Sequence, residues 1–531
     1  MFGTSGIRGP VGDVVTARLT LDVGQAVGVD TDTVVVGRDA RNTGDVLADA
    51  VSVGLREFGT DVIRLGVVST PTLARSVRWL GADAGIGITA SHNPAPDNGI
   101  KLWNPSGQAF TPAQTDTIER RLSTGEVDDP SSDIDDSPTD DSPTDDSPTD
   151  DSLTDDSLTD DIDDSTPDDT SGAVLSEDVG AASWDAFGTE RIEEGVSSRH
   201  LDRLVASFSD TEAPSPTNRT DDSSGEAEGE SAPKPFDDLS IVVDLGNGTG
   251  RVTVDALYEL GATVHTLDAQ CDGRFPARKS EPNAETLTAL QAAVPALDAD
   301  FGIAHDGDAD RMVAVSGGGE YVPGDLLLAL FARDAVETNG LDDGGDSDSR
   351  TSSPRVAVPV DTSLVVADTV SEAGGSVEYT PVGDVHVADA ASQEGFVFGG
   401  EPSGAWIWPA ETLAPDGHYA ALQLATLVAQ NGSLGTLLDS IPAEEYVTRR
   451  ANVAVENKSE AMAAIQRVLR ERYDDIDTID GLRVDTGDGW FLVRPSGTEP
   501  LVRVTAEARD ESLTDDLLDS ALDVVDAEVH P

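Results

Sequence analysis

The amino-acid sequence predicts an α/β protein built from several domains. Its 531 residues exceed the roughly 100 to 200 residues of a typical domain. Short apolar segments alternate with stretches of helical periodicity through most of the chain, which is the pattern of parallel strands joined by helices. Polar stretches at 126–172, 210–237 and 337–354 interrupt this pattern and separate the expected folded units.

The first unit is expected at residues 1–125. Apolar segments at 33–36, 62–65 and 86–88 each adjoin a helical pattern, which predicts a mostly parallel sheet. After the first polar stretch, residues 173–209 are expected to return to this unit as a helix that runs from about 181 to 204.

The stretch at 126–172 is expected to be a disordered insertion. It holds 20 acidic residues and no Lys or Arg, and much of it repeats Asp-Asp-Ser-Pro-Thr with a period of five residues. Such a segment repels itself and has no apolar surface whose burial would offset the entropy of ordering. Calcium binding by these aspartates is the alternative, but a calcium loop needs a glycine turn, which the repeats lack.

Three further folded units follow. Residues 238–336 and 355–440 repeat the α/β pattern, whereas residues 445–531 mix short strands with helices and predict an α+β domain. The clearest expected elements are strands at 239–244, 490–493 and 501–504 and helices at 252–260, 459–472 and 512–525.

The charge balance excludes whole classes of partner. Lys and Arg number 34 and Asp and Glu number 101, so the formal net charge is −67. Leaving out the 20 acids of the repeat still gives −47, and the folded units are therefore acidic as well. Nucleic acids and anionic membranes require a basic surface, so neither is expected as a partner. The solvation strategy of a halophile accounts for the composition.

Cysteine usage and the N-terminus predict a cytoplasmic protein. Cys271 is the single cysteine, which excludes an internal disulfide and a cysteine-based zinc cluster. The chain opens without a basic and apolar leader, and no apolar run approaches the ~18 residues of a membrane span.

The first chemical motif is the loop from Thr89 to Pro94, which follows the apolar run at 84–88. A strand that ends there presents the hydroxyl of Ser91 in a fixed and exposed position. Serine needs a base or a cation to become a nucleophile, and His92 and Lys101 are the nearest candidates in sequence. A capped turn without chemistry is the alternative.

The second motif places Asp306, Asp308 and Asp310 at alternate positions after another apolar strand, around the turn residue Gly307. Three carboxylates that converge in this way suit a hard cation such as Mg²⁺. An EF-hand is excluded, because the sixth loop position is Arg311 and the twelfth is also the wrong residue type. A solvated acidic loop is the alternative, but an arginine beside three carboxylates favours phosphate chemistry.

Three more loops carry groups that bind sugars or phosphates. Glu401 and Ser403 lie in a glycine-rich loop suited to sugar hydroxyls, and residues 3–9 form a small-residue loop ahead of Arg8. Plain turns or a flexible terminus are the alternatives. The last loop contains Arg494, Ser496, Gly497 and Thr498 and is followed by Arg503. These groups suit a phosphate monoester. A capped surface turn is the alternative.

Taken together, these motifs in this order and spacing resemble the α-D-phosphohexomutase superfamily, with the archaeal phosphoglucosamine mutases as the nearest branch. The resemblance covers nearly the whole chain outside the polar insertions. It implies four domains around a central cleft, three of them related α/β domains with mixed sheets and the fourth a C-terminal α+β domain.

The resemblance also implies a reaction. Ser91 is expected to carry a phosphate, with Mg²⁺ between that phosphate and the three aspartates. Phosphate then moves between C6 and C1 of a sugar phosphate through a sugar bisphosphate, which makes the enzyme an isomerase of phosphotransferase type. His92, Lys101 and Arg8 are expected to assist catalysis. The substrate-binding set is expected to be Arg311, Gly383, Asp384, Glu401, Ser403, Arg494, Ser496, Gly497, Thr498 and Arg503.

The sugar is the open part of this prediction. Gly383 and Asp384 resemble the phosphoglucosamine mutase branch, whereas Ala405 departs from the histidine that many members have. Conversion of glucosamine 6-phosphate to glucosamine 1-phosphate is therefore favoured, with glucose and mannose phosphates as alternatives. A metal-dependent phosphatase would gain nothing from two phosphate sites, and a non-catalytic phosphosugar sensor would not need an intact serine and metal loop. Monomer and homodimer both remain open.

Overall fold

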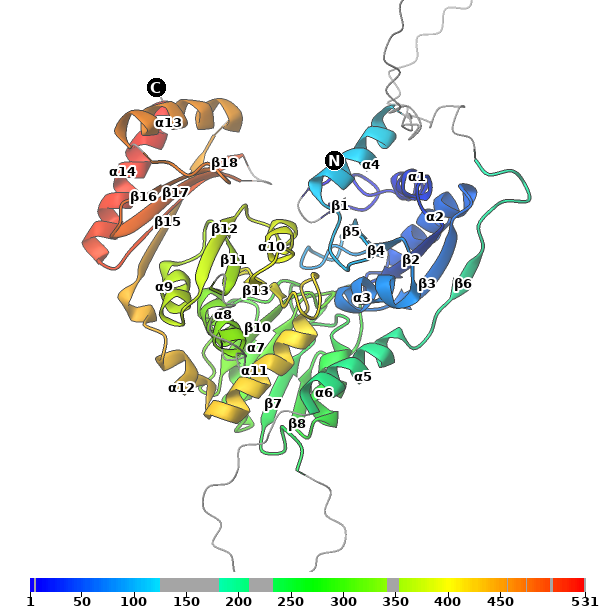
Figure 1. Cartoon of the computed structure of the whole chain (residues 1–531), viewed down its shortest axis with the longest axis horizontal. Helices are drawn as coiled ribbons and strands as arrows, with labels where there is room; N and C mark the ends of the chain where they lie inside the picture. Colours follow the sequence, from blue (N-terminus) through cyan, green and yellow to red (C-terminus); the bar gives the residue numbers. More distant parts are fainter. Residues whose placement is uncertain are drawn as a thin grey trace, which may run out of the picture.

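The computed structural model describes residues 1–3, 6–124, 181–209, 233–340, 353–455, 457–473, 475–496 and 500–529. The acidic repeat and most of the second polar stretch lie outside these ranges, so their disorder stays a prediction. Four sheets follow one another along an arc, which places the first and the last sheet at its two ends (Figure 1). We call the domains built on these sheets I to IV; the limits predicted for them from sequence stay predictions.

Domain I contains a six-stranded sheet in the order β1-β5-β4-β2-β3-β6. The strands β4, β2, β3 and β6 run parallel, whereas β5 pairs antiparallel with both β4 and β1. Its strands are β1 (Ile7–Pro10), β2 (Thr33–Arg38), β3 (Asp61–Val67), β4 (Ala84–Ile88), β5 (Asp97–Trp103) and β6 (Glu190–Ile192).

Domains II and III each contain a four-stranded mixed sheet, in the orders β10-β9-β7-β8 and β12-β11-β13-β14. The strands of domain II are β7 (Ser240–Asp244), β8 (Thr263–Leu267), β9 (Phe301–His305) and β10 (Met312–Ser316). The strands of domain III are β11 (Arg355–Pro359), β12 (Ser376–Thr380), β13 (Phe396–Gly400) and β14 (Trp406–Ile407).

One strand order recurs in these three domains. Numbered within each domain, the last strand pairs antiparallel with the third, the third runs parallel to the first, and the first runs parallel to the second. In domain I the same order is β5-β4-β2-β3. The predicted fold class, with three related mixed-sheet domains and a different fourth one, is confirmed.

Domain IV has an antiparallel sheet in the order β15-β18-β17-β16. Its strands are β15 (Val447–Ala454), β16 (Leu482–Asp485), β17 (Gly489–Pro495) and β18 (Leu501–Ala508). Alternate residues cover two different surfaces, as the pleat requires. Phe491, Val493 and Val504 pack under the helices of the domain, whereas Trp490 and Leu492 face Val360 of domain III.

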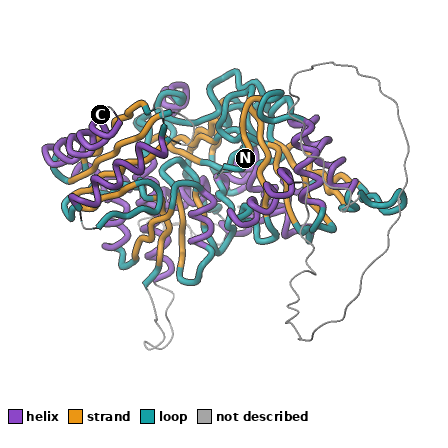
Figure 2. The backbone as a smooth tube through the Cα atoms, turned by 90° about the horizontal axis from the view of Figure 1, so that it is seen from above, coloured by secondary structure: helices purple, strands orange, loops and turns teal. Residues whose placement is uncertain are grey.

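Helices cover the sheets of domains I to III (Figure 2). In domain I the helices α1, α2 and α4 pack on one face of the sheet, and α3 packs on the other. The helices are α1 (Ala17–Gly28), α2 (Gly44–Glu57), α3 (Thr70–Leu80), α4 (Pro112–Thr124), α5 (Val196–Ser209), α6 (Arg251–Glu259), α7 (Thr288–Ala296), α8 (Gly324–Gly340), α9 (Leu364–Glu372), α10 (Asp384–Ala391), α11 (Gly417–Asn431), α12 (Leu434–Asp439), the short 3₁₀ helix η1 (Ala443–Glu445), α13 (Lys458–Arg472) and α14 (Glu511–Val529).

The segment after the acidic repeat differs from the prediction. A helix was expected from about 181 to 204, but the chain is extended there, adds β6 to the edge of sheet I, and becomes helical only at α5. Trp184 and Phe187 are exposed, so this stretch has no apolar stripe facing a core. Helix α5 instead buries Leu204 and Phe208 in the large core that domains II and III share.

Among the described helices, none is both long enough and apolar enough to cross a membrane.

Candidate active site

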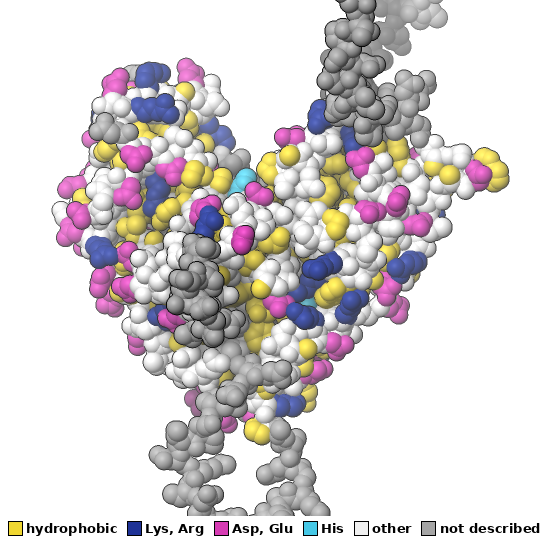
Figure 3. All heavy atoms as spheres, viewed as in Figure 1, with side chains coloured by type: hydrophobic (Ala, Val, Ile, Leu, Met, Phe, Trp, Pro, Cys, Tyr) yellow, Lys and Arg dark blue, Asp and Glu magenta, His cyan; other side chains and the backbone are white. Residues whose placement is uncertain are grey.

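The recurring topology explains why the predicted loops converge. The Ser91 loop joins β4 to β5, the loop with the three aspartates joins β9 to β10, and the loop with Glu401 joins β13 to β14. These are equivalent hairpin connections in three related domains. All three contribute to one cleft of about 830 Å³, which is lined by Arg8, Ser91, Lys101, Asp310, Arg311, Pro359, Asp361, Val382, Gly383, Asp384, Glu401, Pro402, Ser403, Ala405, Pro415 and Arg450. The molecule is visibly hollowed between domains I and IV (Figure 3).

The Ser91 loop is held from below by a fully buried arginine. Arg41 donates hydrogen bonds of 2.7 to 2.9 Å to four backbone carbonyl groups of the loop and the strand after it, and it pairs with Asp39 at 3.0 Å. Ser91 has a φ of 47°, a left-handed conformation that costs energy for a residue with a side chain. The arginine scaffold stabilises this strained backbone.

The Ser91 hydroxyl faces the aspartate loop across the boundary between domains I and II. Its Oγ donates to Asp306 Oδ2 at 2.5 Å and lies 3.3 Å from Asp310 Oδ1. The sequence analysis expected an exposed hydroxyl, but Ser91 is 1 % exposed. The reason is close approach by domain II: Ser280 Oγ donates to the Ser91 carbonyl at 2.8 Å, and a Cβ on Gly307 would lie 2.8 Å from that same oxygen.

The three aspartates form a compact buried cluster. One carboxylate oxygen from each of Asp306, Asp308 and Asp310 lies within 4.8 Å of the other two. Thr70 and Thr89 donate to Asp308 Oδ2 at 2.7 and 2.8 Å, which leaves Asp308 Oδ1 buried without a hydrogen-bond partner in the described structure. Burial and then the neighbouring carboxylates raise the pKa of Asp306 well above its ordinary value and that of Asp310 to about 6. An unpartnered oxygen among crowded carboxylates fits a divalent cation.

Arginine side chains lie near Ser91, and their positive charge favours the neutral form of His92, the next residue. Arg8 Nε is buried and has no hydrogen-bond partner among the residues that the structure describes, so it is available to a ligand. Burial, and then Arg311 and Arg8, lower the pKa of His92 to about 2. Its Nδ1 lies 3.4 Å from Ser91 Oγ, a long contact. A neutral imidazole with so low a pKa is a poor proton donor or acceptor. Lys101 is therefore a better acid/base candidate than His92.

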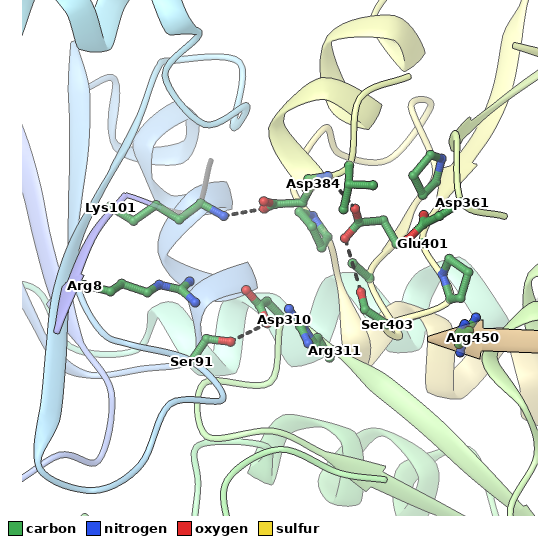
Figure 4. A pocket seen from close by; sticks show the side chains of 16 residues that line it. Arg8, Ser91, Lys101, Asp310, Arg311, Asp361, Asp384, Glu401, Ser403 and Arg450 are labelled. Carbon is green, nitrogen blue, oxygen red and sulfur yellow. Dashed lines mark hydrogen bonds and ion pairs between the residues drawn. The ribbon is translucent and has the colours of Figure 1, made fainter. Parts of the chain in front are cut away.

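Lys101 crosses the cleft from domain I to domain III. Its ammonium group pairs closely with Asp384 at the start of α10, 283 residues away in sequence (Figure 4). Burial opposes ionisation of Asp384, but Lys101 outweighs it and lowers the pKa of the carboxyl. This ion pair joins the Ser91 side of the cleft to the start of α10 in domain III.

The sugar loop is organised around Glu401. Its Oε1 accepts from the Gly383 backbone N–H at 2.8 Å, and its Oε2 accepts from Ser403 Oγ at 3.2 Å. Burial and then Asp384 raise the pKa of Glu401 to about 7. Gly383 has a φ of 132°, which a residue with a side chain rarely adopts. The loop therefore presents a carboxylate and a hydroxyl together to the cleft.

The predicted phosphate loop begins in domain IV at Arg494, beside a second pocket of about 650 Å³. Arg494 and Arg503 line this pocket, and Arg494 pairs with Asp480 at 2.8 Å. Asp480 also accepts from the Val382 backbone N–H at 3.0 Å and so joins the phosphate loop to domain III. Ser496 is buried, whereas Gly497 and Thr498 lie outside the described residues.

A buried polar network connects domains I, II and III behind the cleft. His305 Nδ1 contacts the Arg311 carbonyl oxygen at 2.8 Å, and Thr253 Oγ1 contacts His305 Nε2 and His418 Nδ1, both at 2.8 Å. The network continues through two hydroxyl groups of α3 and its N-cap to His200, which lies 3.4 Å from Asp416. These contacts are His418 Nε2 to Ser69 Oγ at 2.8 Å, Ser69 Oγ to Thr72 Oγ1 at 2.8 Å and Thr72 Oγ1 to His200 Nδ1 at 2.9 Å.

Sequence reasoning missed the groups that hold the site together. Arg41 follows β2 and contacts carbonyl groups 50 to 56 residues further along the chain, so no local pattern pointed to this role. Arg278 donates to the His305 carbonyl at 2.7 Å and pairs with Asp244 at 3.0 Å, and Ser280 supports Ser91. Neither of these two residues belongs to a recognisable motif, so no local signal pointed to them.

Comparison with protein families identifies the class of the chain. Models of the four domains of phosphoglucomutase/phosphomannomutase match in order, with domain I at residues 1–128, domain II at 226–319, domain III at 323–444 and the C-terminal domain at 451–524. The chain belongs to the phosphoglucomutase/phosphomannomutase family. The predicted superfamily is confirmed, and with it an isomerase that moves phosphate on a sugar.

Comparison with individual relatives is more specific than comparison with the family models. The chain is 39 % identical over 528 residues to a probable phosphoglucosamine mutase of Methanopyrus kandleri, which covers 99 % of this chain and 97 % of the relative. It is 37 % identical over 514 residues to a probable phosphoglucosamine mutase of Methanosarcina acetivorans, with 96 % of both chains covered. A phosphoglucomutase/phosphomannomutase family protein of Burkholderia thailandensis shares the fold, with a TM-score of 0.73, 24 % identity and coverage of 99 % and 98 %.

Proposed function

We propose that this enzyme interconverts glucosamine 6-phosphate and glucosamine 1-phosphate. The observation that carries the proposal is the Ser91 hydroxyl aimed at three buried carboxylates, in a cleft whose opposite wall carries Glu401 and Ser403. The choice of glucosamine is supported by full-length relatives of 35 to 39 % identity, which are probable phosphoglucosamine mutases.

The aspartate cluster fits a resident Mg²⁺ ion, to which phospho-Ser91 would contribute an oxygen. The support comes from the buried and unpartnered Asp308 Oδ1 and from the all-oxygen donor set that Asp306, Asp308 and Asp310 provide. When bound, Mg²⁺ would neutralise negative charge on the phosphate during transfer.

In the working enzyme, Ser91 Oγ would carry the phosphate between turnovers. A sugar hydroxyl oxygen forms a new bond to phosphorus as the bond from phosphorus to Ser91 Oγ breaks. Arg8 and Arg311 would donate hydrogen bonds to the phosphate oxygens. Lys101, whose ammonium group lies in the same cleft, is the group that would exchange the hydroxyl proton. His92 is unsuited to this task because of its low pKa.

The product of this step is a sugar bisphosphate. Glu401 and Ser403 would hold sugar hydroxyl groups, while Arg494, Ser496 and Arg503 would hold the phosphate remote from Ser91, together with the predicted Gly497 and Thr498. Reorientation of the bisphosphate then presents its other phosphate to Ser91, which takes it back. The net change is movement of one phosphate between C6 and C1.

The substrate is tested by steady-state kinetics of the purified full chain in high KCl, the condition that the acidic composition favours. Glucosamine 6-phosphate, glucose 1-phosphate and mannose 1-phosphate are compared side by side with saturating Mg²⁺. We expect the highest kcat/KM with glucosamine 6-phosphate. A tenfold preference for either of the other two sugars would replace the proposed substrate while leaving the mutase reaction in place.

A further inference from the structure

Two residues stand at the junction between the sugar cleft and the phosphate pocket. Among the described residues, Asp361 and Arg450 alone line both cavities. Asp361 lies just beyond β11 in domain III, and Arg450 lies on β15 at the start of domain IV. Figure 4 shows Arg450 at the domain IV side of the cleft, across from Ser91 and Arg8. A group at this junction can contact a ligand in either cavity.

The strand register places Arg450 on the same sheet face as the phosphate loop arginines. Arg503 is opposite Asn452 on β15 and opposite Arg494 on β17. Residues paired across antiparallel strands share a face, and Arg450 is two positions from Asn452 on its strand. Three guanidinium groups therefore project from one face of sheet IV, and among the residues that the structure describes Asp361 is the single carboxylate that lines the pocket in front of them.

Arg450 also lacks the ion pairs that occupy its neighbour. Arg449, on the opposite face of the strand, pairs with Glu511 at 2.6 Å and Asp515 at 3.1 Å. Within the described structure, Arg450 has no carboxylate within 4.0 Å and no hydrogen bond. Asp361 and Asp325 lie near enough to feel the charge of Arg450, but neither forms a direct ion pair with it. In a chain with 101 acidic residues against 34 basic ones, an arginine without a direct ion pair in the described structure that faces a cavity points to an external anion.

We infer that Arg450 is a substrate-binding residue that grips the phosphate remote from Ser91. Because it lines both cavities, it stays in contact with the sugar bisphosphate while the intermediate leaves the phosphate loop to reorient. This inference rests on the proposed mutase reaction but not on the identity of the sugar. Its particular consequence is retention of the intermediate: an enzyme that loses the bisphosphate is left with an unphosphorylated Ser91 and stops.

The test compares the variants R450Q, R450K and R449Q of the full chain. We expect R450Q to raise the KM for the sugar phosphate about tenfold or more, the effect of losing a charge-assisted hydrogen bond. We also expect R450Q to need added glucose 1,6-bisphosphate for sustained turnover. R450K should recover part of both properties because it keeps the charge, and R449Q should stay within about twofold of wild type, since a surface ion pair contributes little.

Two results would overturn the inference. One is R450Q kinetics within twofold of wild type and independent of added bisphosphate; the other is an equal loss in R450Q and R449Q, which would indicate a structural effect on β15. Melting temperatures of all variants identify misfolding. If the wild type converts none of the three sugar phosphates, the proposed function fails, and the binding of glucose 1-phosphate to wild type and R450Q by calorimetry still decides whether Arg450 holds phosphate.

Discussion

The two ends of the cleft are built in different ways. At the Ser91 end, the serine, the three aspartates and Arg41 are buried, and hydrogen bonds from domains I and II fix them. At the phosphate loop end, the arginines line a pocket of domain IV. Domain IV contacts domain III through the packing of Trp490 and Leu492 on Val360 and through polar links. Those links include Glu507, which accepts from the Leu364 N–H at 2.6 Å, and Asp480.

The difference matches what each end would have to do. Transfer of a phosphoryl group requires a nucleophile and its charged surroundings in one geometry, and preorganised groups lower the barrier most. The other end must accept a phosphate attached to either end of the sugar, since the intermediate binds in two orientations. A fixed catalytic end and an accommodating binding end therefore predict different consequences for mutations.

The largest effect should come from the fixed end. Ser91→Ala removes the proposed phosphate carrier, so mutase activity should fall by about a thousandfold or more. Binding of glucose 1-phosphate, measured by calorimetry, should remain. The control is Ser123→Ala on an exposed turn of α4. Turnover near the wild-type rate in the Ser91 variant would contradict the proposed mechanism.

Loss of the scaffold should be nearly as severe, and should appear in stability. Arg41→Leu removes the guanidinium from four backbone carbonyl groups of the Ser91 loop and the strand after it and from the Asp39 carboxylate, and breaking a buried pair costs about 3 to 5 kcal/mol. Urea unfolding measures the change. Arg18→Gln is the matched control, because Arg18 is exposed and, in the described part of the chain, pairs only with Asp22 in the same helix. Equal midpoints for the two variants would show that the fixed end does not depend on Arg41.

A smaller change is expected at the accommodating end. Arg494→Gln should raise KM about tenfold to a hundredfold by removing a charged phosphate ligand, with stability nearly unchanged because the side chain is partly exposed. Phosphorylation of Ser91, followed by mass spectrometry, should proceed normally. A drop in kcat with an unchanged KM would instead place Arg494 in the chemical step and weaken the contrast between the two ends.

The smallest effect concerns Glu401, which lies between them. Its pKa is about 7 in the folded protein against an ordinary 4.5, so the folded state holds a proton that the unfolded state releases. This contribution to stability is complete below pH 4.5 and is lost as the pH rises to about 7, by at most about 3 kcal/mol. Glu401→Gln should flatten the fall in melting temperature over that range in metal-free buffer. Parallel curves for wild type and variant would disprove the shift.

Most of the candidate site residues could be predicted from short stretches of the sequence. The spacing of Asp306, Asp308 and Asp310 after an apolar strand was enough to predict a cation site, because all three ligands come from one loop. The strand ends that carry Ser91 and Glu401 were visible for the same reason. In each of these loops, the functional groups and the turn that presents them are adjacent in the chain.

Long-range packing accounts for the rest. The Lys101 partner lies 283 residues away, so its ion pair could not be derived from spacing. The low pKa of His92 arises from burial and from arginines on other elements, and the burial of Ser91 arises from Gly307 and Ser280 in another domain. Helix α5 was misplaced because its packing partners come from different domains: Val196 packs in the core of domain I, whereas Leu204 and Phe208 pack in the core of domains II and III.

The buried histidine network has one further consequence, which concerns the direction of its hydrogen bonds. A carbonyl oxygen can only accept, so the Arg311 carbonyl requires a proton on His305 Nδ1. Burial lowers the pKa of His305 to about 4, so the ring is neutral and its Nε2 accepts from Thr253. The threonine has then used its only hydrogen, and its oxygen must accept from His418 Nδ1.

The same argument applies to the next three hydrogen bonds. Ser69 donates to His418 Nε2 and accepts from Thr72, and Thr72 in turn accepts from His200 Nδ1. His200 Nε2 therefore carries no proton. That nitrogen faces Asp416 across the longest link of the series, 3.4 Å, and makes no hydrogen bond within the described structure. The tautomers of three histidines on three different elements are thus set by one backbone carbonyl beside the aspartate cluster. Reversing any single bond would require reversing them all, so the aspartate loop and the junction of domains I to III form one cooperative unit.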